Sequence, residues 1–87
     1  MTGAEIHVRY WGAIASRLNR EVGTYHFPSP PDVQALLDRI IEEAGPEGKE
    51  VLRTPGVLLA ANGRTVGQGH RLADGDTVDV LSAVAGG

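Results

Sequence analysis

The segment SPPDVQALLDRIIEEAGP, residues 29–46, carries the one strong helical signal of the chain. Small polar residues and prolines at 29–32 are typical of a helix start, and Gly45-Pro46 is typical of a helix end. The apolar residues recur at spacings of three and four, which places them on one helix face: Val33, Leu36, Leu37, Ile40 and Ile41. The segment therefore predicts an amphipathic helix over Pro31–Ala44 with one buried face.

Two segments before this helix predict a β-hairpin. Glu5–Trp11 (EIHVRYW) alternates apolar and polar positions, so we expect a half-buried strand with Trp11 on its polar face. Val22–Phe27 (VGTYHF) is the predicted returning strand, and Pro28 ends it. The intervening residues Gly12–Glu21 are compatible with either a short helical turn or a loop.

Three further strands are predicted after the helix. Val57–Ala61 (VLLAA) indicates a buried strand, and the Asn62-Gly63 turn leads into a short return strand at Thr65-Val66. Thr77–Leu81 (TVDVL) is the predicted final strand, and its alternation places Leu81 on the outer face.

The element order is strand–strand–helix–strand–strand–strand, with a short turn at 47–53. Parallel pairing of the first and last strands at the centre of one sheet satisfies the preference for right-handed crossovers. This arrangement is an α+β fold of the β-grasp (ubiquitin-like) type: a mixed four- to five-stranded sheet with one main helix packed on one face. We expect residues 1–81 to form this domain and residues 82–87 to form a flexible C-terminal Gly-Gly tail.

Composition places the chain among small globular proteins. Its 87 residues are 41% hydrophobic and 22% charged, which is enough for one domain with a thin core. It has no Cys, and its formal net charge is -3 without a Lys/Arg cluster, so disulfides, thiolate metal sites and nucleic-acid binding are not expected. No apolar run reaches membrane-spanning length. We therefore expect a cytoplasmic protein with neither nucleic acid nor membrane as partner.

Motifs for catalysis and cofactor binding are missing from the sequence. The three His residues, His7, His26 and His70, do not have the spacing of metal ligands. A GxxxxGK[ST] phosphate loop is not present either. The sequence thus predicts no bound cofactor, no metal site and no catalytic apparatus of its own.

The most unusual part of the chain is Ser82–Gly87 (SAVAGG). This segment has no charged or bulky side chain before its Gly86-Gly87 end, so we expect it to fit a narrow channel. Fully extended, Ala83–Gly87 reaches roughly 17 Å, enough to place a carboxylate in the active site of another protein.

Four sequence blocks extend this pattern along the chain: Val8–Trp11 (VRYW), Leu59–Gly63 (LAANG), Leu72–Val78 (LADGDTV) and Ala83–Gly87 (AVAGG). With them the chain resembles the MoaD/ThiS family of ubiquitin-like sulfur-carrier proteins over nearly its whole length. Within the family it most resembles the small subunit of molybdopterin synthase. That subunit often has Pro-Pro before its Val-x-Gly-Gly end, where this chain has Ser82-Ala83. Carriers for thiamin, cysteine or another sulfur metabolite therefore stay as alternatives.

The resemblance implies a mechanism and two partners. A ubiquitin-activating-type enzyme would use ATP to adenylate the Gly87 carboxylate, and a sulfur donor would convert it to a thiocarboxylate. The thiocarboxylate would donate sulfur in the large subunit of molybdopterin synthase, for molybdenum cofactor biosynthesis, or in another sulfur-accepting synthase. The chain would act as the sulfur-donating small subunit or co-substrate. A ubiquitin-like protein modifier is the alternative of another class, although Lys49 is its only Lys.

A docking surface is predicted near the start of the tail. If the first and last strands pair, Trp11 and Leu81 become neighbours on the outer face, and an exposed apolar patch is typical of a partner site. A Trp that merely covers a thin core is the competing interpretation. The resemblance adds further residues to the partner-binding set: Thr65, Val66, Val84, Ala85 and Gly86.

Overall fold

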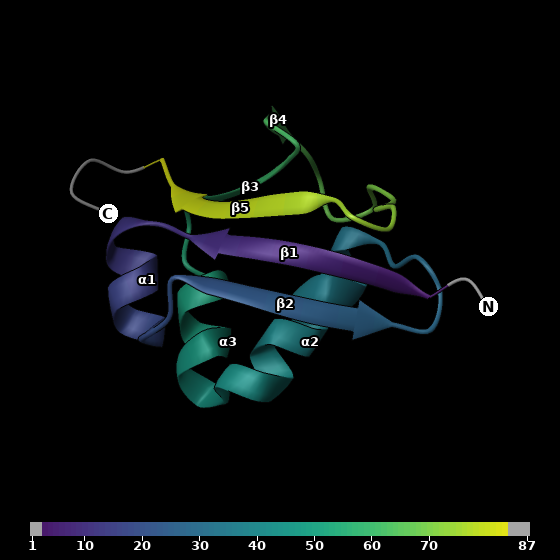
Figure 1. Cartoon of the computed structure of the whole chain (residues 1–87). Coiled ribbons are helices and arrows are strands. Elements are labelled where there is room, and N and C mark those ends of the chain that lie inside the picture. Colours follow the sequence, from purple (N-terminus) through teal and green to yellow (C-terminus); the bar gives the residue numbers. More distant parts are fainter. Residues whose placement is uncertain (1–2, 84–87) are drawn as a thin grey trace.

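The structure is a computed structural model that describes residues 3–83 of the chain. It contains one five-stranded sheet and three helices (Figure 1). The elements in chain order are β1 (Ala4–Tyr10), α1 (Gly12–Leu18), β2 (Val22–Phe27), α2 (Val33–Ala44), α3 (Pro46–Leu52), β3 (Val57–Ala61), β4 (Arg64–Thr65) and β5 (Thr77–Ser82).

The sheet has the strand order β2-β1-β5-β3-β4. Its two central strands, β1 and β5, are parallel, with Val8 opposite Val78 and Tyr10 opposite Val80. The other pairs are antiparallel. The helices lie on one side of the sheet and leave the other side open (Figure 1). This topology confirms the predicted β-grasp fold and its central parallel pair.

Helix α2 forms as the apolar periodicity predicts. The Asp32 side chain caps its first turn by accepting a hydrogen bond of 2.8 Å from the Ala35 N–H. At the other end Gly45 has a φ of 76°, a conformation that favours glycine, and its N–H donates to the Ile41 carbonyl. The helix begins two residues later than predicted because Asp32 is its cap rather than part of it. Of the five apolar residues predicted on its buried face, Ile41 is only half-buried and the other four are buried: Val33, Leu36, Leu37 and Ile40.

Two short helices accompany α2, where the sequence predicted one main helix. Helix α1 occupies the segment left open between the first two strands, and it buries Ile14 and Leu18. It ends at Asn19, which has a left-handed φ of 55°. Helix α3 replaces the predicted short turn and buries Val51. These helices close the end of the core that α2 does not reach.

The strand boundaries differ slightly from the prediction. Strand β1 ends at Tyr10 because Trp11 takes the position before the first turn of α1. Strand β4 is Arg64–Thr65, so Val66 lies beyond it and only donates its N–H to the Leu59 carbonyl. Strand β5 extends to Ser82, one residue further than predicted, since its ladder with β3 continues to Val57.

The core lies between the inner face of the sheet and the helices. Its members are apolar apart from two tyrosine hydroxyl groups: Tyr10 and Tyr25 share a buried hydrogen bond of 2.7 Å. Burial, followed by this hydrogen bond, raises the pKa of Tyr10. The hydroxyl therefore stays neutral, and the pair joins β1 and β2 inside the core.

Candidate docking surface

The open side of the sheet carries every second residue of each strand. On β1 and β5 the register places Arg9 directly opposite Asp79, and on β3 it places Ala60 opposite Asp79. One row further along, Leu81 lies opposite Leu58. Because the helices cover only the other side, these residues line an accessible face (Figure 1).

Trp11 lies at the edge of this face and is half exposed. Its side chain is among the few large apolar groups left in solvent, at 50% relative exposure. It forms one wall of a shallow groove of about 370 Å³ with Ala60, Asp79 and Leu81. The predicted juxtaposition of Trp11 and Leu81 is therefore present, and the ring does not act as a cover for the core.

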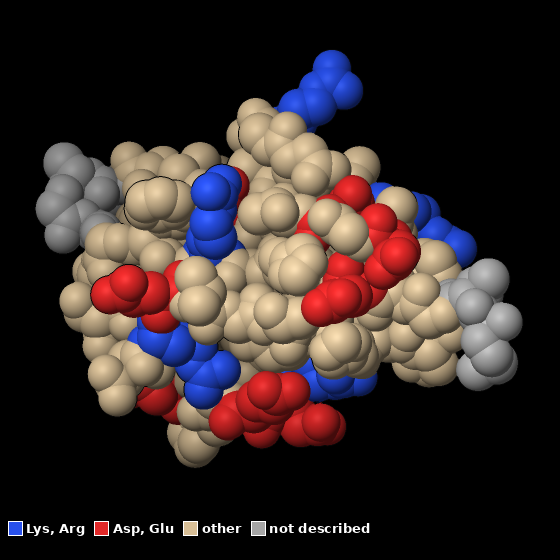
Figure 2. Space-filling view, in the orientation of Figure 1, with Lys and Arg blue, Asp and Glu red and all other residues tan. Residues whose placement is uncertain are grey.

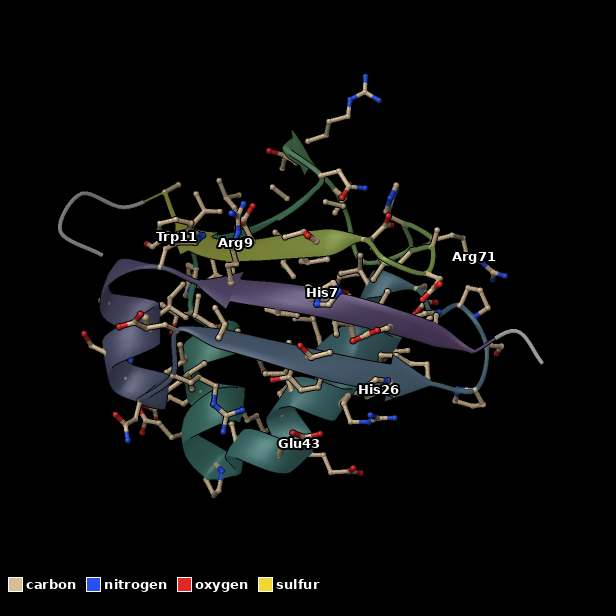
Figure 3. All side chains as sticks on the ribbon, in the orientation of Figure 1. His7, Arg9, Trp11, His26, Glu43 and Arg71 are labelled. Atoms are coloured by element: carbon tan, nitrogen blue, oxygen red, sulfur yellow. The ribbon has the colours of Figure 1, made fainter. Side chains whose placement is uncertain are left out.

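Three hydrogen bonds meet at the Asp79 carboxylate, and one of them holds the Trp11 ring. Its indole N–H donates to Asp79 Oδ1 at 2.9 Å, while Arg9 forms an ion pair with the same carboxylate through Nε at 2.6 Å and Nη2 at 3.0 Å. The hydrogen bond from Arg9 lowers the pKa of Asp79 below its ordinary value. The Arg9 guanidinium also lies 5.6 Å from the centre of the Trp11 ring. Figure 3 shows both labelled side chains beside the end of β5.

The other described candidates divide between the two faces. Thr65 is opposite Ala60 and exposed, so it continues the same open face onto β4. Val66 is half-buried and packs against the core instead. Leu58, at 37% exposure, also belongs to the open face, although the sequence did not predict it as a docking residue. Because β3 is apolar throughout, its sequence does not indicate which side Leu58 faces, and the position of Leu58 opposite Leu81 depends on register.

The predicted tail residues Val84, Ala85, Gly86 and Gly87 lie outside the described residues. The chain approaches them along β5, and the Ala83 N–H donates to the Gly56 carbonyl at 2.7 Å. The groove beside Leu81 therefore lies at the end of the sheet from which the tail departs.

A second apolar groove, of about 380 Å³, occupies the helix side of the same end. Its wall includes Ile14 of α1, Val51 of α3 and Val57 of β3, and it reaches Ser82 at the end of β5. Both sides of the sheet thus offer apolar surface to a partner near the C-terminal end of β5.

The two signs of charge are distributed differently in this view. Figure 2 shows Lys and Arg side chains scattered, while Asp and Glu side chains gather in patches at the right and along the bottom. At the opposite end of β5, Asp74 accepts from the Glu5 N–H and Asp76 accepts from the Asn62 side chain. These carboxylates accept hydrogen bonds that stabilise the turn before β5. Residues 3–83 contain no group of three His, Cys, Asp or Glu side chains able to hold a metal ion. Nor do they contain a helix long and apolar enough to cross a membrane.

The fold and its open apolar face define a ubiquitin-like protein. Residues 14–87 match the family model described as the ThiS family, and the chain therefore belongs to the ThiS family of ubiquitin-like sulfur carriers. None of the curated protein sequences matches it significantly.

Solved structures of similar fold include archaeal and bacterial proteins. A putative molybdopterin converting factor subunit 1 from Pyrococcus furiosus is 21% identical, with a TM-score of 0.77 over 93% of this chain and 99% of that one. The small archaeal modifier protein 1 of Methanosarcina acetivorans is 17% identical, with a TM-score of 0.80 and all of both chains covered. In a complex of subunits 1 and 2 of the molybdopterin-converting factor of Helicobacter pylori, the matching chain is 23% identical, with a TM-score of 0.65 over 95% of this chain and 99% of that one. At these identities the likeness shows a shared fold.

Proposed function

We propose that this chain is a cytoplasmic sulfur carrier that bears its sulfur on the carboxyl group of Gly87. An adenylating enzyme of the ubiquitin-activating type transfers AMP from ATP to this carboxylate and releases pyrophosphate. A sulfur donor then attacks the acyl carbon and displaces AMP, which leaves a thiocarboxylate. ATP binds to the enzyme, in line with the absence of a phosphate loop in this sequence.

The observation that carries the proposal is the position of the apolar groove in a chain of this family. Trp11 and Leu81 form it at the end of β5 that leads into the tail. An enzyme that holds the Trp11–Leu81 surface would therefore receive the tail in its own active site. An exposed apolar patch with a polar rim is the usual form of such a partner surface.

For the sulfur acceptor we propose a molybdopterin synthase large subunit. The complex of the two Helicobacter pylori converting-factor subunits supports this choice, since one of its chains shares the fold of this chain. The thiocarboxylate sulfur would attack the precursor bound in the large subunit, with the carrier leaving as its carboxylate after hydrolysis. A synthase for thiamin, cysteine or another sulfur metabolite is the second candidate acceptor.

A role as a protein modifier is the second candidate function. It is favoured by the likeness to the archaeal modifier protein 1, whose fold covers the full chain. In that case a substrate lysine amine would take the place of the sulfur donor and form an isopeptide bond with Gly87. Lys49, the only Lys, is exposed on α3 and is the one side-chain amine of the chain itself that such a reaction could use.

The experiment that tests the proposal is intact-mass analysis of the purified chain. The protein is incubated with a ubiquitin-activating-type enzyme, ATP and a sulfide donor, with a reaction lacking ATP as control. We expect ATP-dependent replacement of one oxygen by sulfur, localised to Gly87 by fragmentation. Loaded carrier is then offered separately to molybdopterin, thiazole and cysteine synthases. Conjugates to other proteins in place of the sulfur exchange would favour the modifier role.

A further inference from the structure

One carboxylate organises the docking surface described above. Asp79 is only 13% exposed although it lies on the open face, and it accepts three hydrogen bonds. Two come from the Arg9 guanidinium and one from the Trp11 indole. Such a bidentate pair can contribute to stability. The carboxylate and the Trp11 indole also line the groove, so the arrangement shapes that surface as well.

Asp79 fixes the orientation of the Trp11 ring by one hydrogen bond, from the ring N–H at 2.9 Å. The Trp11 backbone is held separately, since its N–H donates to the Val80 carbonyl at 3.1 Å. The ring then stands as one wall of the groove, with Ala60 and Leu81 as the other walls. A half-exposed side chain without such a bond loses rotamer freedom when a partner immobilises it, and that loss weakens binding.

The ion pair with Arg9 neutralises the negative charge of Asp79, which would otherwise oppose the binding of an apolar side chain in the groove. Asp79 lines the groove, so an unpaired carboxylate there would have to lose water when a partner bound. Arg9 neutralises it in bidentate fashion and is itself half exposed, at 52%. Among residues 3–83, Arg9 is the charged group that contacts this carboxylate, and the Trp11 indole N–H is its other hydrogen-bond donor.

We infer that Asp79 is a positioning residue, which holds Trp11 so that the groove exists before the partner arrives and accepts one apolar side chain of the adenylating enzyme. This inference rests on the proposed function, because it concerns how strongly the carrier is recognised by that enzyme. Asp79 does not touch the reacting carboxylate. Its removal should therefore change recognition and leave the chemical step unaltered.

The first measurement uses the isolated protein. The ¹⁵N-labelled indole N–H of Trp11, the only Trp, gives one NMR signal whose hydrogen exchange reports the Asp79 bond. We expect Asp79→Ala to accelerate this exchange about tenfold or more, since the donor loses its acceptor. Asp79→Asn keeps an acceptor oxygen and should restore much of the protection. Asp38→Ala, which removes the same charge from α2, is the matched control and should change nothing.

The second measurement is the steady-state rate of ATP-dependent sulfur loading. Asp79→Ala should raise the KM for the carrier about tenfold at unchanged kcat, because the lost binding is shared equally by the ground state and the transition state. Trp11→Phe keeps the Arg9–Asp79 pair but replaces the indole, with its N–H, by a smaller ring that cannot donate to Asp79. It should also raise KM, and it serves as the second variant if Asp79→Ala fails to fold. Unchanged indole exchange in Asp79→Ala, or a fall in kcat without a rise in KM, would overturn the inference. If the wild-type chain never acquires sulfur, the proposed function fails, whereas the exchange measurement still decides the role of Asp79.

Discussion

At the scale of single residues, the described core contains a buried hydrogen bond between two side chains. The hydroxyl groups of Tyr10 and Tyr25 lie 2.7 Å apart inside it, and Arg20 Nη1 lies 3.3 Å from the Tyr25 hydroxyl at the border to solvent. A buried hydroxyl without a partner costs much more than a satisfied one contributes. The pair therefore specifies the alignment of β1 against β2 as well as filling space.

We predict that Tyr25→Phe destabilises the protein, because it leaves the Tyr10 hydroxyl buried without its partner. The free energy of unfolding should fall by about 1–3 kcal/mol, measured by urea denaturation. The control is the double variant with Tyr10→Phe. Removal of both hydroxyl groups should recover part of the loss, and a strictly additive double variant would contradict this account.

A pH dependence follows from Asp79. Its pKa is lowered in the folded state, chiefly by the hydrogen bond from Arg9. A carboxyl group with a lowered folded pKa stabilises the protein above its unfolded pKa, near 3.8, and this contribution disappears as the pH falls through the folded value. The difference in unfolding free energy between wild type and Asp79→Asn should therefore shrink as the pH is lowered through the ordinary aspartate range. A difference that grew on acidification would contradict the assigned direction.

The sequence located part of this site and missed part, for a physical reason. Trp11 and Leu81 follow from strand alternation alone, since each stands at an odd position of a strand whose even positions are apolar. Leu58 and the Arg9–Asp79 pair depend on which residues of separate strands lie opposite each other. Arg9 and Asp79 are 70 residues apart in sequence, and the packed core sets the register that places them opposite each other. The alternation within one strand does not predict this register.

At the scale of elements, the long helix was predictable and the short ones were not. Helix α2 has five periodic apolar residues, a capping Asp32 and a terminating Gly45, so local signals agree. Helices α1 and α3 have seven residues each, and helices of that length depend on tertiary packing. Their buried residues Ile14 and Val51 show that the core supplies what the local sequence lacks.

We predict that Asp32→Ala destabilises the protein by about 1 kcal/mol, because the Ala35 N–H loses its capping acceptor. Thermal unfolding followed by circular dichroism measures the change. Asp38→Ala, on the same helix and with the same change of charge, is the control and should have a much smaller effect. Equal effects of the two substitutions would show that charge, rather than capping, governs the start of α2.

At the scale of the whole molecule, the fold separates stability from recognition. The helices and the inner strand residues form the core, while the open face carries the exposed Trp11 and Leu58 and the half-buried Leu81. Both apolar grooves lie at the end of β5 from which the tail departs. A partner can therefore hold the folded domain at this end and receive residues 84–87 without disturbing the core.

This separation predicts that Leu81→Asp weakens partner binding far more than folding. A charged side chain in the groove would lose water on binding, and the loss of an apolar anchor at an interface commonly costs ~2 kcal/mol or more. Isothermal titration against the adenylating enzyme measures affinity, and thermal unfolding measures stability. His26→Asp, which adds an acid to an exposed β2 position away from the groove, is the control. Equal loss of affinity in both variants would remove the groove from the docking surface.

The last prediction concerns Gly87, where the proposed chemistry takes place. Deletion of Gly87 moves the terminal carboxylate back by about 3.5 Å along an extended chain. Reacting groups must come within about 3–3.5 Å of each other, so adenylation should be nearly abolished. Gly86→Val keeps the carboxylate at residue 87 and adds a branched side chain, which should hinder entry into a narrow channel. One residue added after Gly87 should block loading by turning the reactive carboxyl group into an amide.

None of these tail changes should alter the melting temperature, because the buried side chains of the described core all lie between Ala4 and Val80. The expected result is a normal melting curve together with no ATP-dependent exchange of oxygen for sulfur in the protein mass. Sulfur loading of the truncated chain would place the reactive group elsewhere and contradict the proposed function. Normal loading of Gly86→Val with loss only in the Gly87 deletion would instead show that reach, and not the width of the channel, limits the reaction.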